Sequence, residues 1–488
     1  MAIETITYNP AVEIMADELQ SVRTCIKGSY FIKREGERFL PHPSSIDKDH
    51  TRYASLLAGA DFEGFTSTTM TSLLSRMNIQ DTEILLPKKL EYLRNDADGD
   101  GLSLKGMLTT TAKNVLPAGW HVLLTDFKGL SDIKARDLSR ADVKDMKPRA
   151  TIKQYVREEV VDWDFARING RMQLTFILLR EVSSELDHET LDRKKVTTYL
   201  KLAIDDTGYY QQKYTEVDDA TGIQKGDIHY IKINDIPLKF IPLEIVADSE
   251  IEGGEMPLDA GYLTSISDIA LSMYNTSAKL KEVLAALVPA LFVYGMDKTA
   301  LEDFEATNSR KYIAMGAFTP NFMPRSKSEM EVEILSAKDN TLAFERELES
   351  KAKSARAAGA VFSNDQSGQR TATQVIDEAT TSSAILTPLS AAEESAFERC
   401  IIYAGMFEGL YDPDDLQAAF GEVVVDMPSN FGASKITAAE AKEYREAQAM
   451  GAITIKTYLK AMKLGGWEIG DIEQELADIE SQGPREIV

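Results

Sequence analysis

A short acidic run, Asp96-Ala97-Asp98-Gly99-Asp100-Gly101, has the spacing of the opening of a calcium-binding loop. In such a loop, alternating carboxylates surround the ion. The match then fails, because an EF-hand needs an apolar residue at loop position eight and a bidentate Glu at position twelve, where this chain has Ser103 and Met107. We therefore expect a polar turn that leads into a helix over 104–115, with no metal ion and no cofactor. A cation bound between Asp96 and Asp100 is the open alternative.

Two pairs of adjacent carboxylates could in principle do acid–base chemistry. They are Glu158-Glu159 and Asp205-Asp206. Neighbours in sequence do not converge on one substrate, so we interpret both pairs as solvated faces or turns. His121 begins an apolar strand without a candidate partner nearby, and we interpret it as a satisfied structural histidine.

Tyr209 and Tyr210 could form a platform on which bases stack, but no basic residues interleave with them as such a groove would need. We interpret them as strand residues. The sequence also lacks a phosphate-binding glycine loop, a nucleophile elbow and a His-x-x-x-His helix. These absences disfavour an enzyme, and no catalytic residue is assigned.

Composition limits the class of protein. The 488 residues suffice for two to four domains, and the formal net charge of -24 argues against a nucleic-acid binder that wraps its ligand. The charge leaves room for a surface past which DNA slides without sticking. Cys25 and Cys400 are too few for a disulfide framework, which fits a reducing cytoplasm. No apolar run is long enough to span a membrane, so no membrane partner is expected.

The first half of the chain predicts helices followed by strands. Apolar spacing predicts helices over 10–26, around 53–60, over 67–77, near 90–93 and over 104–115. A β section follows from 120 to 246, with a charged surface excursion at 129–149. Asn169-Gly170 lies between two strand-like runs and predicts a hairpin, and 205–208 predicts another turn.

The clearest helix signal runs from Pro257 to Leu287. Its apolar residues alternate at three and four, which is typical of a seam against another long helix. The residues that we expect at a subunit interface are Leu263, Ile266, Met273, Leu280, Leu284 and Leu287.

Residues 340–410 predict two long helical arms separated by a polar break, Ser363–Gln369. Pro388 lies inside the second arm and should kink it. The apolar faces of two such arms suit an assembly in which each helix packs against its copy in a neighbouring subunit. Taken alone, this stretch favours the other interpretation, a helical hairpin inside an ordinary large domain.

Short strands and helices complete the second half. Between the seam helix and the arms we expect strands at 291–294, 312–315 and 332–335, with a local basic group of Arg310, Lys311, Arg325 and Lys327. Beyond residue 410 we expect a strand at 421–427 and helices at 437–448, 451–465 and 471–480.

The order of these elements resembles that of the portal proteins of tailed bacteriophages, the head-to-tail connectors. The likeness covers most of the chain, and it depends on the order of motifs that are each weak. The motifs are 100–104, Pro117 to Leu123, Arg149 to Trp163, Pro257-Leu258 with Tyr274, Asn275, Ser277 and Ala278, Gly368 to Ser383 with Thr371-Ala372-Thr373, Gly451 to Thr454, and the acidic 471–475. Residues 129–149 and Pro388 do not fit the pattern.

The resemblance implies an α+β portal-type fold that assembles as a ring, usually of twelve subunits. It implies an N-terminal α/β wing at 1–256, stem helices at 257–289 and 337–361, and a small α/β clip at 290–336. It further implies a tunnel loop at 362–370, a long kinked helix returning to the wing at 371–435, and a helical crown at 436–488. The tunnel-loop residues that would face DNA are Ser363, Asn364, Asp365, Gln366, Ser367, Gly368, Gln369 and Arg370.

The implied function is a channel at one capsid vertex through which double-stranded DNA is packaged and ejected. The implied partners are copies of the chain, the terminase large subunit, the head-tail adaptor, and the major capsid and scaffolding proteins. The basic clip residues would meet the motor or the adaptor. The chain would assemble in the host cytoplasm and end in the virion. The alternatives are another ring- or shell-forming virion protein, or an intracellular enzyme with an unrecognised site.

Overall fold

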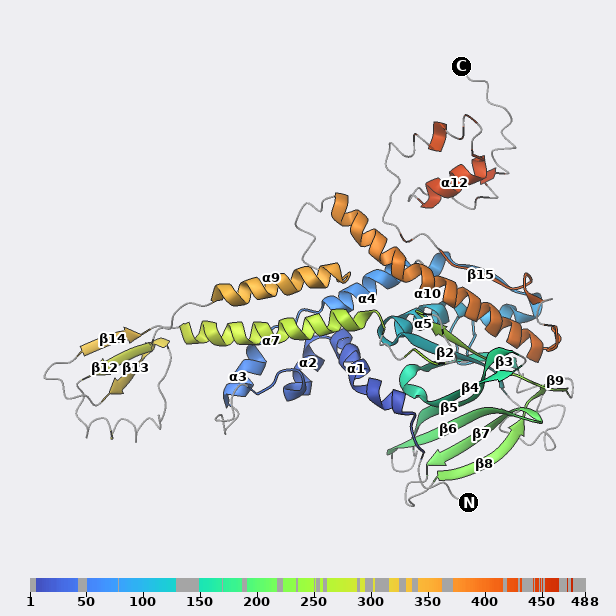
Figure 1. Cartoon of the computed structure of the whole chain (residues 1–488), viewed down its shortest axis with the longest axis horizontal. Coiled ribbons are helices and arrows are strands. Elements are labelled where there is room, and N and C mark those ends of the chain that lie inside the picture. The colour runs from blue at the N-terminus through green and yellow to red at the C-terminus, as the bar shows by residue number, and fades with distance from the viewer. Residues whose placement is uncertain are drawn as a thin grey trace.

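The computed structural model of the chain (Figure 1) contains both helices and sheets. It describes residues 6–42, 51–77, 79–128, 149–168, 170–186, 191–216, 223–233, 236–249, 251, 255–257, 261–287, 290–294, 302, 316–323, 331–335, 341–361, 372–415, 419–428, 431 and 453–464, with scattered residues between 442 and 450 and between 472 and 476.

The body is built on a three-stranded antiparallel sheet. Its strands are β2 (Trp120–Lys128), β3 (Arg149–Val156) and β11 (Leu243–Ala247), in the order β11-β2-β3. Helix α10 (Ala372–Phe407) packs against all three strands, and α5 (Leu104–Ala118) packs against β2 and β11. The sheet is thus covered by helices from two distant parts of the sequence.

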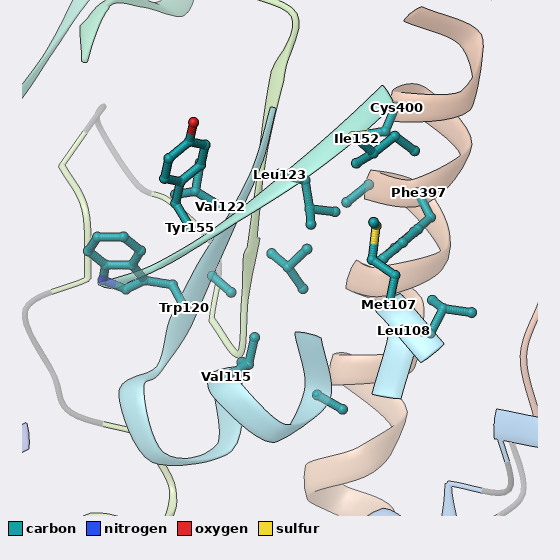
Figure 2. Packing of buried hydrophobic residues seen from close by; sticks show 14 of the residues in the cluster. Met107, Leu108, Val115, Trp120, Val122, Leu123, Ile152, Tyr155, Phe397 and Cys400 are labelled. Carbon is teal, nitrogen blue, oxygen red and sulfur yellow. The ribbon is translucent and has the colours of Figure 1, made fainter. Parts of the chain in front are cut away.

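Large apolar side chains fill the space around this sheet (Figure 2). Met107 and Leu108 of α5, Leu123 of β2, and Phe397 and Cys400 of α10 are all fully buried. Burying a side chain of this size stabilises the fold by roughly 1.5–3 kcal/mol. The buried apolar side chains of α10 from Leu386 to Cys400 therefore face the core of the same chain.

A second sheet is a five-stranded antiparallel meander. It comprises β4 (Val160–Ile168), β5 (Arg171–Leu186), β6 (Arg193–Asp205), β7 (Gly208–Glu216) and β8 (Ile223–Tyr230) in sequence order. Ile168 lies opposite Arg171, which confirms the predicted hairpin, and Gly170 takes a positive φ of 82° that a side chain would strain. Asp205 lies opposite Gly208, which confirms the second predicted turn.

Four helices form the N-terminal part: α1 (Pro10–Lys27), α2 (Ser29–Glu35), α3 (Thr51–Gly59) and α4 (Phe65–Arg76). Asn9 caps α1 by accepting a hydrogen bond from the Ala11 amide, with Pro10 at the first helical position. The limits of α1, α3 and α4 lie close to the predicted ones, whereas α2 was not predicted. Short segments complete this region: η1 (Gly36–Arg38), η2 (Ile79–Asp81), β1 (Glu83–Leu85), η3 (Lys88–Arg94) and η4 (Arg157–Glu159), with the two-stranded ribbon β9 (Lys232–Ile233) and β10 (Ile236–Pro237) further along the chain.

An arm extends from the body (Figure 1). It consists of α7 (Leu263–Leu287) and α9 (Thr341–Ala357), which pack side by side. At its far end lies a small sheet of β12 (Ala290–Tyr294), β13 (Gly316–Met323) and β14 (Glu331–Leu335), in the order β13-β12-β14. The strand expected at 312–315 lies outside the described residues; β13 begins only at Gly316.

The remaining elements confirm several local predictions. Helix α10 is continuous through Pro388, and the kink expected there stays a prediction. Strand β15 (Val424–Asp426) pairs with β1. Helix α12 (Ile455–Leu464) lies where the sequence predicted it. Helix α5 extends past Pro117 to Ala118, three residues beyond the predicted end. Among the residues that the structure describes, no helix has the length and apolar character of a membrane span.

Candidate functional site

The proximal half of α7 is buried within the chain, which corrects part of the predicted interface. Leu263 and Ile266 are 0% exposed and Met273 is 7% exposed, and all three belong to the core cluster that also contains side chains of α5 and α10. The same periodicity would arise from an intrachain or an intersubunit seam, because both need one continuous apolar face. These three residues are therefore core residues and are not accessible to a neighbouring subunit.

The distal half of α7 is different. Leu280 and Leu287 are only partly buried, and Leu284 is 47% exposed. At the start of α9, Leu342 is 63% exposed. Neither α9 nor α3, both of which contact α7, buries these leucines fully, so among the described residues they form an apolar surface that remains available to another molecule.

Polar contacts join α7 to α9 midway along the arm. The Lys351 ammonium donates to the Thr276 hydroxyl at 2.6 Å and pairs with the Glu347 carboxylate at 2.6 Å. The hydrogen bond from Lys351 lowers the pKa of Glu347 below its usual range. This triad fixes the register of the two helices, although its exposed ion pair contributes little to stability.

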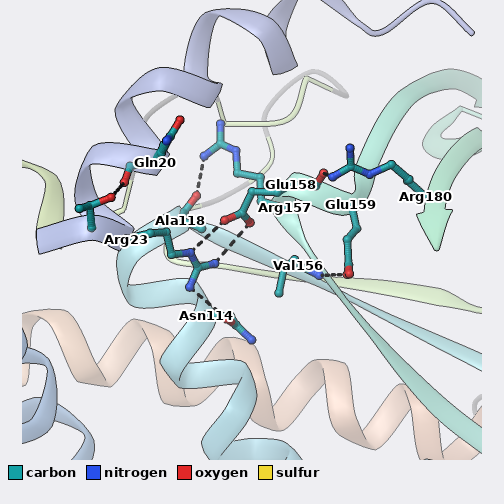
Figure 3. A network of polar contacts seen from close by, with 10 residues as sticks. Gln20, Arg23, Asn114, Ala118, Val156, Arg157, Glu158, Glu159 and Arg180 are labelled. Carbon is teal, nitrogen blue, oxygen red and sulfur yellow. Dashed lines mark hydrogen bonds and ion pairs between the residues drawn. The ribbon is translucent and has the colours of Figure 1, made fainter. Parts of the chain in front are cut away.

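The arm is attached to the body through a compact root, of which Figure 3 shows Arg157 beside Ala118. The Arg157 guanidinium donates to the carbonyl oxygens of Ala118 and Pro257 and lies 5.0 Å over the Trp120 ring. The Trp120 indole donates to the same Pro257 carbonyl at 3.1 Å. A Cβ on Gly261 would lie 2.5 Å from the Leu116 carbonyl oxygen, so only glycine allows this approach.

The adjacent carboxylates Glu158 and Glu159 have separate structural roles (Figure 3). Glu158 accepts from the Arg23 guanidinium at 2.9 Å, and the same Arg23 donates to the Asn114 side chain. Glu159 accepts from the Val156 amide at 2.9 Å, and burial raises its pKa. The two carboxylates thus serve different partners, in agreement with the sequence interpretation that they do not converge.

The carboxylates of Asp96 and Asp98 in the acidic loop at 96–101 accept hydrogen bonds from nearby backbone amides, and Asp96 also pairs with Arg149. Asp96 Oδ1 accepts from the Gly101 amide, and its Oδ2 pairs with Arg149. Asp98 Oδ1 accepts from the amides of Asp100 and Leu102. Among the described residues, no group of three or more His, Cys, Asp or Glu side chains has an arrangement that could hold a metal ion. The hydrogen bonds of Asp96 and Asp98 confirm the predicted polar turn that leads into α5.

His121 lies in the core of β2 and is 0% exposed. Burial, together with the charge of Arg23, lowers its pKa to about 3. Neither ring nitrogen has a hydrogen-bond partner among the described residues, so the expectation of a satisfied histidine was wrong. A neutral, enclosed imidazole of this kind cannot reach a substrate.

The remaining candidates are structural as well. Tyr209 is fully buried, and Tyr210 packs against Tyr230 with ring centroids 5.6 Å apart. The two tyrosines thus face opposite sides of β7 and do not form a stacking platform, as the strand interpretation required. Asp205 accepts from the amides of Thr207 and Gly208, which closes its turn.

Two sets of predicted site residues lie outside the described part of the chain. They are the polar segment Ser363, Asn364, Asp365, Gln366, Ser367, Gly368, Gln369 and Arg370, and the basic group Arg310, Lys311, Arg325 and Lys327. Their neighbouring elements are described: α9 and α10 flank the first set, and β12, β13 and β14 surround the second in sequence.

Sequence reasoning missed the carboxylates of α10 that hold β15. Glu398 accepts from the Val425 amide at 3.1 Å, and Glu394 accepts from the Met427 amide at 2.7 Å. Their spacing of four residues places both on one helix face, which is the only available sequence signal. Glu393 is fully buried, and its carboxylate oxygens have no hydrogen-bond partner among the described residues. Burial raises the pKa of Glu393.

Comparison with known proteins gives three findings. A sequence family described as a domain of unknown function (DUF4055) matches residues 262–408, which contain α7, α9 and α10 but less than a third of the chain. No curated protein sequence matches.

Among solved structures, the chain is similar to a chain in the neck of an empty GTA particle, with a TM-score of 0.39, 12% identity, and coverage of 87% of this chain and 96% of that chain. It is also similar to a chain of the virion of a native gene transfer agent particle, with a TM-score of 0.39, 11% identity, and coverage of 88% and 98%. A TM-score this low does not establish a common fold.

Proposed function

We propose that this chain is a portal-type protein that assembles into a ring with an axial channel at one vertex of a virus-like particle. The observation that carries the proposal is the arm. Helix α7 has 25 residues and is therefore about 37 Å long, and its distal half contacts α9 on one side and the region of α3 on another. Leu284 and Leu342 remain exposed there, and copies arranged around an axis would cover them.

In this proposal each region takes one role. Helices α7 and α9 form the stem, and the sheet β12–β14 forms the clip that docks the packaging motor and later the head-tail adaptor. The basic residues Arg310, Lys311, Arg325 and Lys327 would meet an acidic surface there. Residues 363–370 form the tunnel loop, the N-terminal α/β body forms the wing, and the segment from 436 forms the crown. The two similar structures belong to gene transfer agent particles, but the arm supports a ring without that likeness.

Net charge supports a channel that DNA passes without being held. The chain carries a formal charge of -24, so a ring of copies would be strongly acidic as a whole. Tight DNA binding needs several phosphate contacts from Lys and Arg, whereas an acidic lining repels phosphate over about 10 Å at 0.1 M salt. The function would be translocation and ejection of DNA.

Electron microscopy of the purified chain tests the proposal. The expected result is isolated rings with an axial hole, and native mass spectrometry would then count the subunits. Shells or sheets would point to a capsid component, and a monomer at micromolar concentration would contradict any ring assignment.

A deletion tests the channel separately from the ring. Removing Asn364–Gly368 should leave rings intact and reduce the DNA packaged per particle. Full particles from this deletion would show that the segment only connects α9 to α10.

A further inference from the structure

Two exposed surfaces on the first helical hairpin carry opposite charge. We define the acidic face as Glu13, Ile14, Asp17 and Glu18 of α1, all exposed. Residues three and four apart share one side of a helix, so Asp17 and Glu18 flank Ile14, which is 76% exposed. The result is an apolar knob surrounded by carboxylates.

The second surface lies where α1 ends and α2 begins. We define the aromatic corner as Lys27, Tyr30, Phe31 and Arg34, all exposed. Tyr30 is 71% exposed and packs edge-on against Phe31 at 5.3 Å, and the Lys27 ammonium lies 5.6 Å from the Phe31 ring centre. Arg34 has no ion pair among the described residues. Exposed aromatic residues and arginine are the types most enriched in protein interfaces.

We propose that the aromatic corner of one copy binds the acidic face of the next copy, so that the α1–α2 hairpin forms a head-to-tail contact around the ring. The proposal rests on the ring assembly proposed above and adds its partner surfaces. Ile14 would pack on Tyr30 and Phe31, while Lys27 and Arg34 would meet Glu13 and Glu18.

The distance between the two surfaces along α1 favours a second copy as the mate. Thirteen residues of α1 separate Ile14 from Lys27, which corresponds to about 20 Å along one helix. Ile14 and Lys27 of one copy are thus held apart, so the apolar knob does not reach the Lys27–Phe31 end of the corner in its own chain. A contact between two different patches of identical chains repeats in one direction, and it closes into a ring when the rotation allows.

The position of the hairpin also fits a contact between copies. Helix α1 packs on α7 beside the root of the arm (Figure 1). The corner is a cationic island in a chain with a net charge of -24, so a neighbouring copy is itself an acidic partner. Asp17 pairs with Arg38 at 2.6 Å but keeps 86% of its side chain exposed, which leaves the acidic face accessible.

Charge reversal with rescue tests the contact. Lys27→Glu with Arg34→Glu should raise the midpoint concentration for assembly at least about tenfold, because like charges would then face each other across the interface. Glu13→Lys with Glu18→Lys should do the same. Combining all four changes should restore rings in electron microscopy. The matched control reverses Lys113 and Lys225, which are exposed and lie outside both surfaces, and should leave assembly unchanged.

Cysteine cross-linking gives a readout that does not depend on ring closure. A mixture of an Ile14→Cys chain and a Tyr30→Cys chain should form disulfide-linked dimers under mild oxidation, because both native cysteines are buried. In the control mixture, a Leu85→Cys chain takes the place of the Tyr30→Cys chain, because Leu85 is also exposed, at 56%.

The outcomes separate this inference from the proposed function. Rings that form normally with either surface reversed, and cross-links no stronger than the control, would overturn the contact while leaving the ring function intact. Shells with strong Ile14–Tyr30 cross-links would refute the portal-type ring and keep the contact. A monomer without cross-links would refute both.

Discussion

Arg157 shows how a buried charge can be held without weakening the body. Its guanidinium faces the Ala118 carbonyl at the C-terminus of α5, where the helix dipole is negative, and the face of Trp120. It also reaches the Pro257 carbonyl, which lies 100 positions away in sequence. No local pattern in the sequence links these residues, because the contact exists only after the sheet and α5 have packed. For this reason the periodicity that located α7 could not locate its root.

The tight approach at Gly261 makes the root sensitive to one methyl group. Gly261→Ala would place its Cβ 2.5 Å from a carbonyl oxygen and 2.6 Å from the Gly119 nitrogen, both backbone atoms that cannot swing away. We expect the free energy of unfolding to fall by about 1–3 kcal/mol. Urea denaturation measures this. In the control Gly64→Ala, the added Cβ meets nothing within 4 Å, and the change should stay within about 0.5 kcal/mol. Equal stabilities for the two variants would contradict the description of the root.

His121 should make the chain acid-sensitive. Burial lowers the pKa of His121 to about 3 from the ordinary 6.5. Between these two pH values the unfolded state therefore binds a proton on His121 and the folded state does not. Stability from this group is present above pH 6.5 and is lost as the pH falls towards 3, with a loss of about 2 kcal/mol by pH 5. His121→Leu should remove this part of the pH dependence. The measurement is urea denaturation of both proteins at pH 7 and pH 5, and identical pH dependences would refute the assignment.

At the scale of elements, local patterns predicted the helices and hairpins well. Residues 10–26, 67–77 and 104–115 became α1, α4 and α5 with small changes at their ends. Apolar spacing indicates that one face of a helix is buried, but it does not indicate which element covers that face. This is why Ile266 and Leu284 looked equivalent in sequence, although one lies in the core of the body and the other on the open half of the arm. Likewise, the roles of Glu394 and Glu398 in holding β15 depend on tertiary packing that spacing does not encode.

The two halves of α7 should therefore respond differently to the same substitution. Ile266→Asp puts a carboxylate into the core and should destabilise the monomer by about 3 kcal/mol or more. Leu284 is already 47% exposed, so Leu284→Asp should change the stability of the monomer by less than about 1 kcal/mol. It should nevertheless reduce assembly, measured by sedimentation velocity, because the charge would enter the surface between copies. Normal assembly of Leu284→Asp would remove the distal leucines from the proposed interface.

At the scale of the whole molecule, the shape of the arm and the net charge affect the association of copies in opposite directions. A thin arm gains little from its own packing, so its exposed leucines favour association, while a charge of -24 on each copy opposes it. The association of such copies should strengthen with salt, because ions screen the repulsion over a Debye length that shortens from about 30 Å at 0.01 M to about 10 Å at 0.1 M. The head-to-tail contact between the α1–α2 hairpins would offset part of this repulsion at short range.

The same charge leads to a prediction about DNA. Purified assemblies should not retain double-stranded DNA at any salt concentration from 0.02 to 0.2 M (roughly the range over which phosphate binding is most salt-dependent). A protein that grips DNA would bind at the low end and release it at the high end, with a slope set by the number of phosphates neutralised. An acidic channel should give no binding at either end, because screening weakens repulsion but creates no contact. Filter binding of labelled DNA, with a basic DNA-binding protein as control, measures this. A steep salt-dependent affinity would show that basic side chains line the path of the DNA, and it would contradict a channel that lets DNA slide.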